Sequence, residues 1–407
     1  MAGPLSHIRV LDLSRVLAGP WASQNLADLG AEVIKVERPG AGDDSRAFGP
    51  PWVKDGAGKD TKDSAYFTSA NRGKKSITLN IAAPEGQAIA RELAIASDVL
   101  IENYKYGDLA RYGLAYDQLK GLNARLIYCS VTGFGQTGPY RERPGYDFMI
   151  QGMGGMMSVT GEPDDAPGGG PQRAGVPIAD IITGMYASIA ICAALAHRER
   201  TGKGQSLDLA LLDSQIALLA YQNTNYFATG KPPKRIGNLH PNIVPYQPFR
   251  AADGEVILAC GNDNLYRKFC GAAGCPELAR DPRFTTNGKR VENRAELARL
   301  LGAVFRKRTK REWLEVLEAA GVPNGPINDV AQVFDEPQVK ARGVRIELEH
   351  PAAGKLPLVA SPMRFSETPI EYRQAPPLLG EHTEEILRGV LGKSQDEIAR
   401  LRNARVI

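Results

Sequence analysis

The sequence predicts an α/β protein in which an open, mostly parallel sheet forms a large domain and a smaller α+β domain follows. Three observations lead to this fold class. Short apolar segments alternate with helical patterns through the first third of the chain, the composition changes after Gly230, and 407 residues are enough for more than one folded unit. Strands that alternate with helices indicate a parallel sheet that is covered on both faces.

The elements of the first third are predicted from their apolar patterns and their ends. Ile8–Ser14 is an apolar strand, and Ala31–Glu37 is a second one. Gly19–Gly30 is predicted as a helix, because Pro20 suits a first helical turn and Gly30 suits a C-cap. The alternation continues with strands Ser76–Ile81, Asp98–Asn103 and Ala124–Gly135 and with a helix Pro84–Ala96.

A second unit is predicted after Lys231–Phe249, a basic segment rich in proline that is typical of a linker or an active-site loop. Ala251–Gly261 is predicted to form a turn and a strand, and Glu292–Gly321 to form two helices. Lys355–Pro369 is predicted as a strand pair, and a helix is expected from Thr383 onward. The predicted domains are residues 1–225 (large domain), 226–330 (small domain with linkers) and 331–407 (a segment that returns to the large domain).

Composition and charge exclude several classes of protein. The formal net charge of +4, from 50 basic and 46 acidic residues, is too small to indicate a nucleic-acid partner. Five cysteines form no CxxC pair and no metal-ligand spacing, and four of them are predicted to be buried thiols. Because the N-terminus also shows no signal-peptide pattern, a cytoplasmic protein is expected.

A dinucleotide site of the NAD type is not expected. Glu37 does end the second strand at the place where such folds carry a ribose-binding acid. The turn after the first strand, however, has the sequence SRVLAGP and lacks the glycines of G-x-G-x-x-G. Without these glycines the backbone cannot cradle a pyrophosphate in that manner.

The segment Gln172–Gln205 carries a carboxylate, Asp180, at the start of a long apolar helix. The residues from Ile181 to Ala196 include only three polar side chains. A mid-chain apolar run of this length, bounded by a carboxylate, is predicted to lie in a protein core and not to span a membrane. We expect Asp180 to be the N-cap, accepting N–H bonds from the first turn that keep its carboxylate ionised, as a nucleophile requires.

Further stretches carry a resemblance that covers nearly the whole chain. They are Arg9–Arg46, Asn71–Asn80, Glu102–Leu114, Tyr128–Tyr140, Thr201–Gln205 and Pro377–Leu387. With the Asp180 segment, this ordered set resembles the family III CoA-transferases, which include formyl-CoA and crotonobetainyl-CoA transferases. Asp180 falls at the position of the family's catalytic aspartate.

The resemblance implies a Rossmann-like sheet, an interlocked homodimer and coenzyme A thioesters as substrates. It implies no permanently bound cofactor, no metal, and neither a nucleic-acid nor a membrane partner. Asp180 would pass through an aspartyl anhydride and an aspartyl-CoA thioester, under a glycine-rich loop that is either Pro163–Pro171 or Gly237-Asn238. The coenzyme A ligands it implies are Arg15, Val16, Leu17, Ala18, Arg38, Asn71, Arg72, Lys74, Lys75, Asn103, Tyr104, Arg111 and Tyr112.

The substrate acids are suggested by a closer likeness to the members that use succinyl-CoA and dicarboxylates such as glutarate. A second carboxylate calls for an arginine partner, and the resemblance points to Arg173 and Arg235, with His240 nearby. A racemase relative has a histidine near the position of Tyr146, and tyrosine is a poor base near neutral pH. Tyr146 is instead expected either to bond the reacting carboxyl group or to be packed. Two alternatives stay open: an alpha-methylacyl-CoA racemase-like isomerase and a non-catalytic CoA-binding protein.

Overall fold

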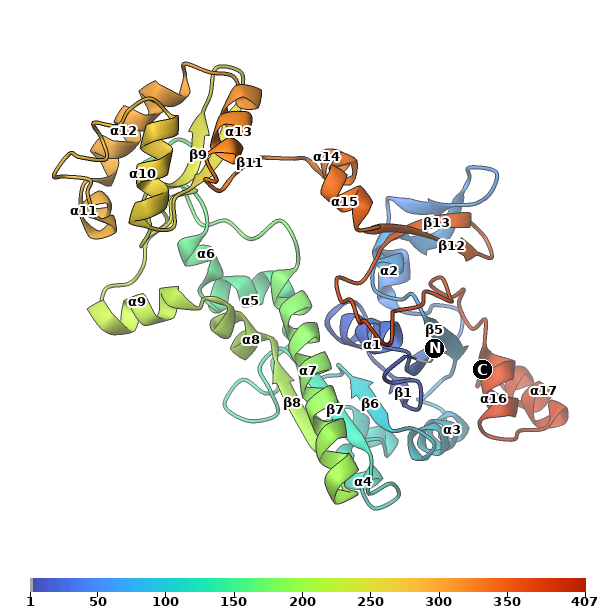
Figure 1. The fold of residues 1–407 in the computed structure, drawn as a ribbon. Helices are drawn as coiled ribbons and strands as arrows, with labels where there is room; N and C mark the ends of the chain where they lie inside the picture. The colour runs from blue at the N-terminus through green and yellow to red at the C-terminus, as the bar shows by residue number, and fades with distance from the viewer. Residues whose placement is uncertain (1–2) are drawn as a thin grey trace. The chain divides into compact units, whose positions relative to one another are not determined.

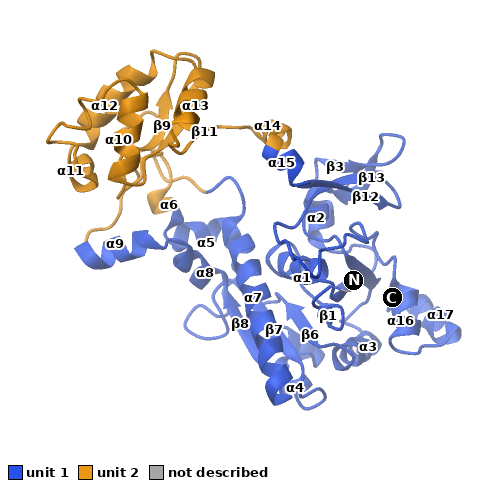
Figure 2. Ribbon diagram, in the orientation of Figure 1, with its two compact units in different colours: residues 1–156, 174–229, 338–407 blue, residues 157–173, 230–337 orange. Residues whose placement is uncertain are grey.

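The computed structural model describes residues 3–407, which form two compact units (Figure 2). Unit 1 consists of Met1–Met156, Ala174–Thr229 and Gln338–Ile407, and unit 2 consists of Met157–Arg173 and Gly230–Pro337. Residues 157–173, which the sequence analysis assigned to the first domain, therefore belong to unit 2. Each unit is described by itself below.

A six-stranded parallel sheet forms the centre of unit 1, as the alternation of strands and helices predicted. The strand order is β5 (Lys74–Thr78), β2 (Glu32–Glu37), β1 (Arg9–Asp12), β6 (Val99–Glu102), β7 (Ile127–Thr132) and β8 (Ser206–Ala210). The order reverses on the two sides of β1, where the chain crosses from β5 to β6. In sheets of this kind ligands bind beyond the carboxyl ends of the strands at such a reversal.

Both faces of this sheet are buried, because alternate side chains of each strand enter different cores. Val10 and Val33 pack with α1 and α7 on one face, in a core that also holds Ile191. Leu11 and Ile34 enter the core on the other face. That second core contains α3 and the two C-terminal helices, so the last part of the chain completes unit 1.

The helices of unit 1 lie between and around these strands (Figure 1). They are α1 (Ala18–Asp28), α2 (Ala65–Thr68), α3 (Pro84–Ile95), α4 (Tyr116–Leu119), α5 (Asp147–Met153), α7 (Ile178–Thr201), α8 (Leu211–Leu218), α9 (Tyr221–Thr229), α16 (Thr383–Gly389) and α17 (Gln395–Asn403), with 3-10 turns η1 (Asp44–Ala47) and η2 (Leu109–Tyr112). The short helices α6 (Met156–Val159) and α15 (Pro337–Ala341) cross the boundaries between the units.

Two small antiparallel sheets complete unit 1. They pair β3 (Trp52–Lys54) with β4 (Asp60–Ser64), and β12 (Arg345–His350) with β13 (Gly354–Val359). The prediction of a strand pair within Lys355–Pro369 was wrong, because this segment supplies one strand and its partner precedes it in the chain. The alternation of charged and apolar residues in Arg345–His350 was the missed signal for that partner.

Helix α7 packs closely on α1, although much of its surface is exposed. A Cβ at Gly184 would lie 2.6 Å from the carbonyl oxygen of Ala18, so glycine permits the close approach. Among the described residues α7 is the one helix long and apolar enough to cross a membrane by length and composition, and 39% of that stretch is buried. The expectation that α7 is enclosed on every face is therefore wrong for a single chain.

Unit 2 is built on the three-stranded antiparallel sheet β11 (Asn324–Pro326), β10 (Glu255–Ala259) and β9 (Tyr246–Arg250). The predicted linker Lys231–Phe249 thus ends inside strand β9. The helices are α10 (Asp263–Ala272), α11 (Asn287–Glu292), α12 (Arg294–Phe305), α13 (Lys310–Ala319) and α14 (Val330–Asp335). The two helices predicted within Glu292–Gly321 are α12 and α13, and the stacked rings of Phe249 and Phe305 join α12 to the sheet.

Candidate active site

The amino end of α7 is capped by a side chain from another helix. Asp147, the first residue of α5, accepts hydrogen bonds at Oδ1 from the backbone N–H groups of Ala179 (2.8 Å) and Asp180 (3.4 Å). The Nε2 group of Gln151, one turn further along α5, donates to the other oxygen of Asp147 at 2.7 Å. The prediction that Asp180 is the N-cap was therefore wrong: α7 begins at Ile178, and Asp180 is its third residue.

With this arrangement the pKa of Asp180 is raised, whereas the sequence analysis expected its carboxylate to be stabilised. The N–H groups that were expected to stabilise its negative charge donate to Asp147 instead. Burial raises the pKa of Asp180 to about 7, and the nearby negative charge of Asp147 adds to this effect. The prediction that helix-end hydrogen bonds keep Asp180 ionised is not supported, and near neutral pH the group is poised between its two forms.

Asp180 lies in the wall of a cavity of about 210 Å³ in unit 1, at the carboxyl ends of β1, β6 and β7. Of the predicted site residues, the structure brings these to the same cavity: Arg15, Val16, Leu17, Ala18, Asn103, Tyr104, Tyr146 and Asp180. Tyr146 is 71% exposed and is therefore not packed in unit 1. The site lies where open parallel sheets bind ligands.

Tyr66 is a site residue that the sequence analysis missed. It lies in the short helix α2, and burial raises its pKa to about 12, with further contributions from Asp180, Asp147 and Asp43. Its hydroxyl group therefore stays protonated near neutral pH and can donate a hydrogen bond. No motif in the segment around Tyr66 predicts that it interacts with these carboxylates, because Asp147 and Asp180 are far from it in sequence.

Arg15 and Tyr104 connect the Asp180 cavity to a smaller one that Arg38 also lines. The guanidinium group of Arg15 lies 5.2 Å from the centroid of the Tyr104 ring. Asp44 accepts hydrogen bonds from both Arg15 (3.0 Å) and Arg38 (2.5 Å), which brings the two cations together. Two paired arginines beside an aromatic ring are suited to phosphate groups and a flat heterocycle.

Four predicted coenzyme A ligands line neither of these two cavities, and the structure gives each of them other partners. Arg72 forms a bidentate ion pair with Asp28, at 2.9 Å and 2.5 Å. Lys74 is fully buried, and its Nζ donates to Asn71 at 2.9 Å and to Asp12 at 3.3 Å. Lys75 pairs with Glu32 and Glu385 on the other side of the strand. The contacts of Asn71, Arg72, Lys74 and Lys75 with coenzyme A stay a prediction.

Arg111 and Tyr112, two further predicted coenzyme A ligands, lie in η2. Neither lines the Asp180 cavity, and Arg111 is an exposed residue that pairs with Asp108 at 2.8 Å. Asp108 itself does line the cavity. The basic residue is therefore held beside the site, and its contact with a ligand stays a prediction.

Arg173, Arg235 and His240, the predicted substrate ligands, belong to unit 2. Arg235 is largely buried and forms an ion pair with Asp164. His240 accepts hydrogen bonds at Nδ1 from two backbone N–H groups of its own loop, and burial lowers its pKa. The N–H of Gly237, in one of the two predicted glycine-rich loops, donates to the carbonyl oxygen of Gly161, two residues before the other loop, at 3.1 Å.

The site can supply a carboxylate nucleophile in a cavity that Tyr146 also lines, with arginines within one connected set of cavities. Within residues 3–407, no group of three or more His, Cys, Asp or Glu side chains is placed to hold a metal ion. Four of the five cysteines are buried, as predicted, and none of them lines the Asp180 cavity. The chemistry that this arrangement favours is acyl transfer to a carboxylate.

Comparison with known proteins defines the class. The sequence model of CoA-transferase family III matches residues 5–383, and the chain therefore belongs to this family and is an enzyme of the CoA-transferase type. A succinate–glutarate CoA-transferase of Agrobacterium fabrum is 50% identical over 384 residues, which cover 94% of this chain and 95% of the relative.

Two further matches agree with this assignment. A human succinyl-CoA:glutarate CoA-transferase is 44% identical over 404 residues, 99% of this chain and 90% of the relative. The crystal structure of a CAIB/BAIF family protein from Brucella suis is similar with a TM-score of 0.83 and 49% identity, over 96% of this chain and all of that one. The recognition of the family from ordered sequence motifs is confirmed.

Proposed function

We propose that this enzyme transfers coenzyme A from succinyl-CoA to a dicarboxylate such as glutarate, with Asp180 as the covalent nucleophile. The observation that carries the proposal is the position of Asp180 in a cavity shared with Arg15 to Ala18, Asn103 and Tyr104. The names of the full-length relatives, at 44% and 50% identity, support the choice of donor and acceptor.

In the proposed reaction, a carboxylate oxygen of Asp180 attacks the thioester carbonyl of succinyl-CoA, and the thiolate of CoA leaves. The thiolate then attacks the aspartyl carbonyl of the resulting anhydride, which releases succinate and leaves CoA on Asp180 as a thioester. Glutarate attacks this thioester and displaces the thiolate. The thiolate finally attacks the glutaryl carbonyl, which gives glutaryl-CoA and restores the carboxylate. The net reaction exchanges one thioester for another with little change in energy, and its division into several acyl transfers is the general logic of covalent catalysis.

Side chains around Asp180 support distinct parts of this scheme. The hydroxyl group of Tyr146, which lines the cavity, is suited to donate to the oxyanions that form at each attack. Arg15 and Arg38 are suited to the phosphates of coenzyme A, which would replace Asp44 as their partner. In this proposal the Rossmann-like large domain carries the coenzyme A site.

The test is mass spectrometry of the acyl-CoA products. The enzyme is incubated with succinyl-CoA and a pool of acids that contains glutarate, 3-hydroxy-3-methylglutarate, mesaconate, itaconate, oxalate, carnitine and malate. Formation of glutaryl-CoA in preference to the other thioesters would support the proposal. No exchange with any acid, together with loss of an alpha-deuterium label from 2-methylacyl-CoA, would favour the racemase-like alternative, and CoA binding without any reaction would favour a binding protein.

Arg173→Ala and Arg235→Ala are each expected to raise the KM for glutarate about tenfold, because a bidentate arginine partner of the distal carboxylate is lost. Butyrate, which has one carboxylate, should be used equally well by the variants and the parent enzyme. Lys234→Ala is the matched control, because it removes an exposed cation directly before Arg235 in the same loop. An unchanged KM for glutarate in both arginine variants would contradict the assignment of Arg173 and Arg235 as ligands of the distal carboxylate.

We also propose that two copies associate through the exposed side of α7, as interlocked subunits. Met185, Tyr186 and Ile189 on this helix are 46%, 41% and 62% exposed, and Ile216 on α8 is 44% exposed. Exposed apolar side chains gathered on adjacent helices are typical of a surface that a partner covers. Light scattering should therefore give a dimer, and Ile189→Glu should shift it toward the monomer. A parent protein that is monomeric at micromolar concentration would contradict this proposal.

A further inference from the structure

Val16, which lies between β1 and α1, has an unusual backbone conformation. Its φ is +70°, in the left-handed region that β-branched residues almost never adopt. Such a conformation is strained and persists only where surrounding contacts enforce it. Val16 also lines the cavity that contains Asp180. The contacts that hold this residue are therefore of functional interest.

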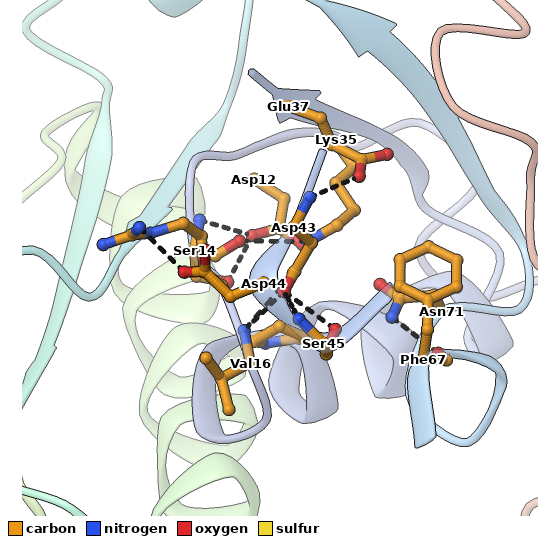
Figure 3. A network of polar contacts seen from close by, with 12 residues as sticks. Asp12, Ser14, Val16, Lys35, Glu37, Asp43, Asp44, Ser45, Phe67 and Asn71 are labelled. Carbon is orange, nitrogen blue, oxygen red and sulfur yellow. Dashed lines mark hydrogen bonds and ion pairs between the residues drawn. The ribbon is translucent and has the colours of Figure 1, made fainter. Parts of the chain in front are cut away.

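A buried ion pair between Lys35 and Asp43 holds the backbone at Val16 (Figure 3). The backbone N–H of Val16 donates to both carboxylate oxygens of Asp43, at 3.1 Å and 3.3 Å. The Nζ group of Lys35 donates to Asp43 at 2.8 Å and to the carbonyl oxygen of Ser14 at 3.0 Å. One pair of charged side chains thus fixes the backbone on both sides of Arg15.

Two further residues fix the rest of this loop. Asn103 accepts from the N–H of Arg15 at 2.8 Å and donates to its carbonyl oxygen at 2.7 Å. Asp12 accepts from the N–H of Ser14 at 2.9 Å. Three consecutive residues, Ser14, Arg15 and Val16, are therefore held by side chains from β1, from β2, from the residue after β6 and from the segment before η1.

The burial of the charged side chains of Lys35 and Asp43 is costly, and this indicates a role beyond stability. The side chains of Lys35 and Asp43 are both completely buried. Burial alone would raise the pKa of Asp43, but the charge of Lys35 and hydrogen bonds from Lys35 and Ser45 hold it well below its usual range. A buried ion pair is often no more stabilising than apolar residues of the same size, so its presence is better explained by what it orients.

We propose that Lys35 and Asp43 are positioning residues for coenzyme A binding, which hold Val16 in its left-handed conformation so that Arg15 to Ala18 line the active-site cavity. This inference rests on the proposed function only in taking that loop as a coenzyme A ligand. It assigns no direct substrate contact to Lys35 or Asp43. Because glycine adopts a positive φ without strain, the role of Asp43 should disappear when residue 16 is glycine.

The test is a double-mutant cycle with Asp43→Asn and Val16→Gly, read as the Kd for free coenzyme A by calorimetry and the KM for succinyl-CoA. Asp43→Asn is expected to raise both constants about tenfold and to change kcat less than about threefold, because positioning of a ligand loop affects binding. In the Val16→Gly background the same substitution should change them less than about threefold. Equal effects of Asp43→Asn in both backgrounds would overturn the proposal.

A second variant covers the case in which Asp43→Asn does not fold. Val16→Pro leaves the ion pair intact, but it removes the N–H that Asp43 accepts from and fixes φ near −65°. It is expected to weaken coenzyme A binding at least about tenfold, and unchanged binding would overturn the proposal. Asp98→Asn is the matched control, because Asp98 pairs with buried Arg198 at the amino end of β6. It should lower the Tm without changing the Kd for coenzyme A.

Failure of this inference can be separated from failure of the proposed function. A parent enzyme that binds coenzyme A but transfers it to no acid would refute the proposed function, while the Kd values still test the role of Asp43. A parent enzyme that transfers coenzyme A, with variants that bind it normally, would refute the inference alone.

Discussion

Asp180→Ala is expected to lower kcat for CoA transfer by about 10³-fold or more, because every proposed covalent intermediate is formed on this side chain. The parent enzyme, mixed with succinyl-CoA and no acceptor, should gain the mass of an aspartyl-CoA thioester on the peptide that contains Asp180. Hydroxylamine should remove this adduct and leave a hydroxamate at the same residue. The variant should show neither species.

A loss of folding would produce the same loss of activity, so stability serves as the control. The pKa of Asp180 is raised in the folded protein to about 7 from a usual 3.8. A raised folded-state pKa means that the contribution of this carboxyl group to stability is present at low pH and is lost as the pH rises through about 7. Asp180→Ala should therefore melt no lower than the parent at pH 8. Transfer at parental rates by a folded variant would refute the nucleophile assignment.

The sequence was sufficient for those features that depend on local pattern. Short apolar strands alternating with helices gave the parallel sheet, and the Asp180 segment with its companion motifs gave the family. Motifs also located Arg15 to Ala18, Asn103 and Tyr104, which the fold brings to one cavity with Asp180. This grouping could be predicted because parallel strands carry their following loops to one edge of the sheet, while the contacts of these residues with coenzyme A stay a prediction.

The sequence was insufficient where the partner of a residue lies far away in the chain. Asp147 precedes the residues it caps by more than thirty positions, so nothing near Asp180 revealed that its helix end was already occupied. Arg72 and Lys74 look like ligands of phosphate in a basic stretch, yet their partners in the fold are Asp28 and Asp12. A cation that faces a buried carboxylate and a cation that faces a ligand have the same sequence signature.

The position of Asp147 leads to the last prediction, which concerns pH. Only the ionised form of Asp180 is a nucleophile, and its pKa is about 7 because of burial and, secondarily, the charge of Asp147. Below this value kcat/KM should fall about tenfold per pH unit, or about a hundredfold between pH 7 and pH 5. Asp147→Asn removes the neighbouring negative charge, so the pKa of Asp180 should fall and the profile should move to lower pH.

The choice of asparagine separates the charge of Asp147 from its role as a helix cap. Asparagine caps a helix about as well as aspartate, whereas Asp147→Ala should lose both the charge and the hydrogen bond from the N–H of Ala179.

The 3′-phosphate of coenzyme A also titrates near pH 6, but its effect is common to the parent, Asp147→Asn and Asp147→Ala. Tyr66, whose pKa is about 12, stays protonated throughout this range. A profile that is identical in the parent and Asp147→Asn would show that Asp147 does not control the ionisation of Asp180. A profile that moves in Asp147→Asn, with a lower Tm only in Asp147→Ala, would assign the two roles to the same carboxylate.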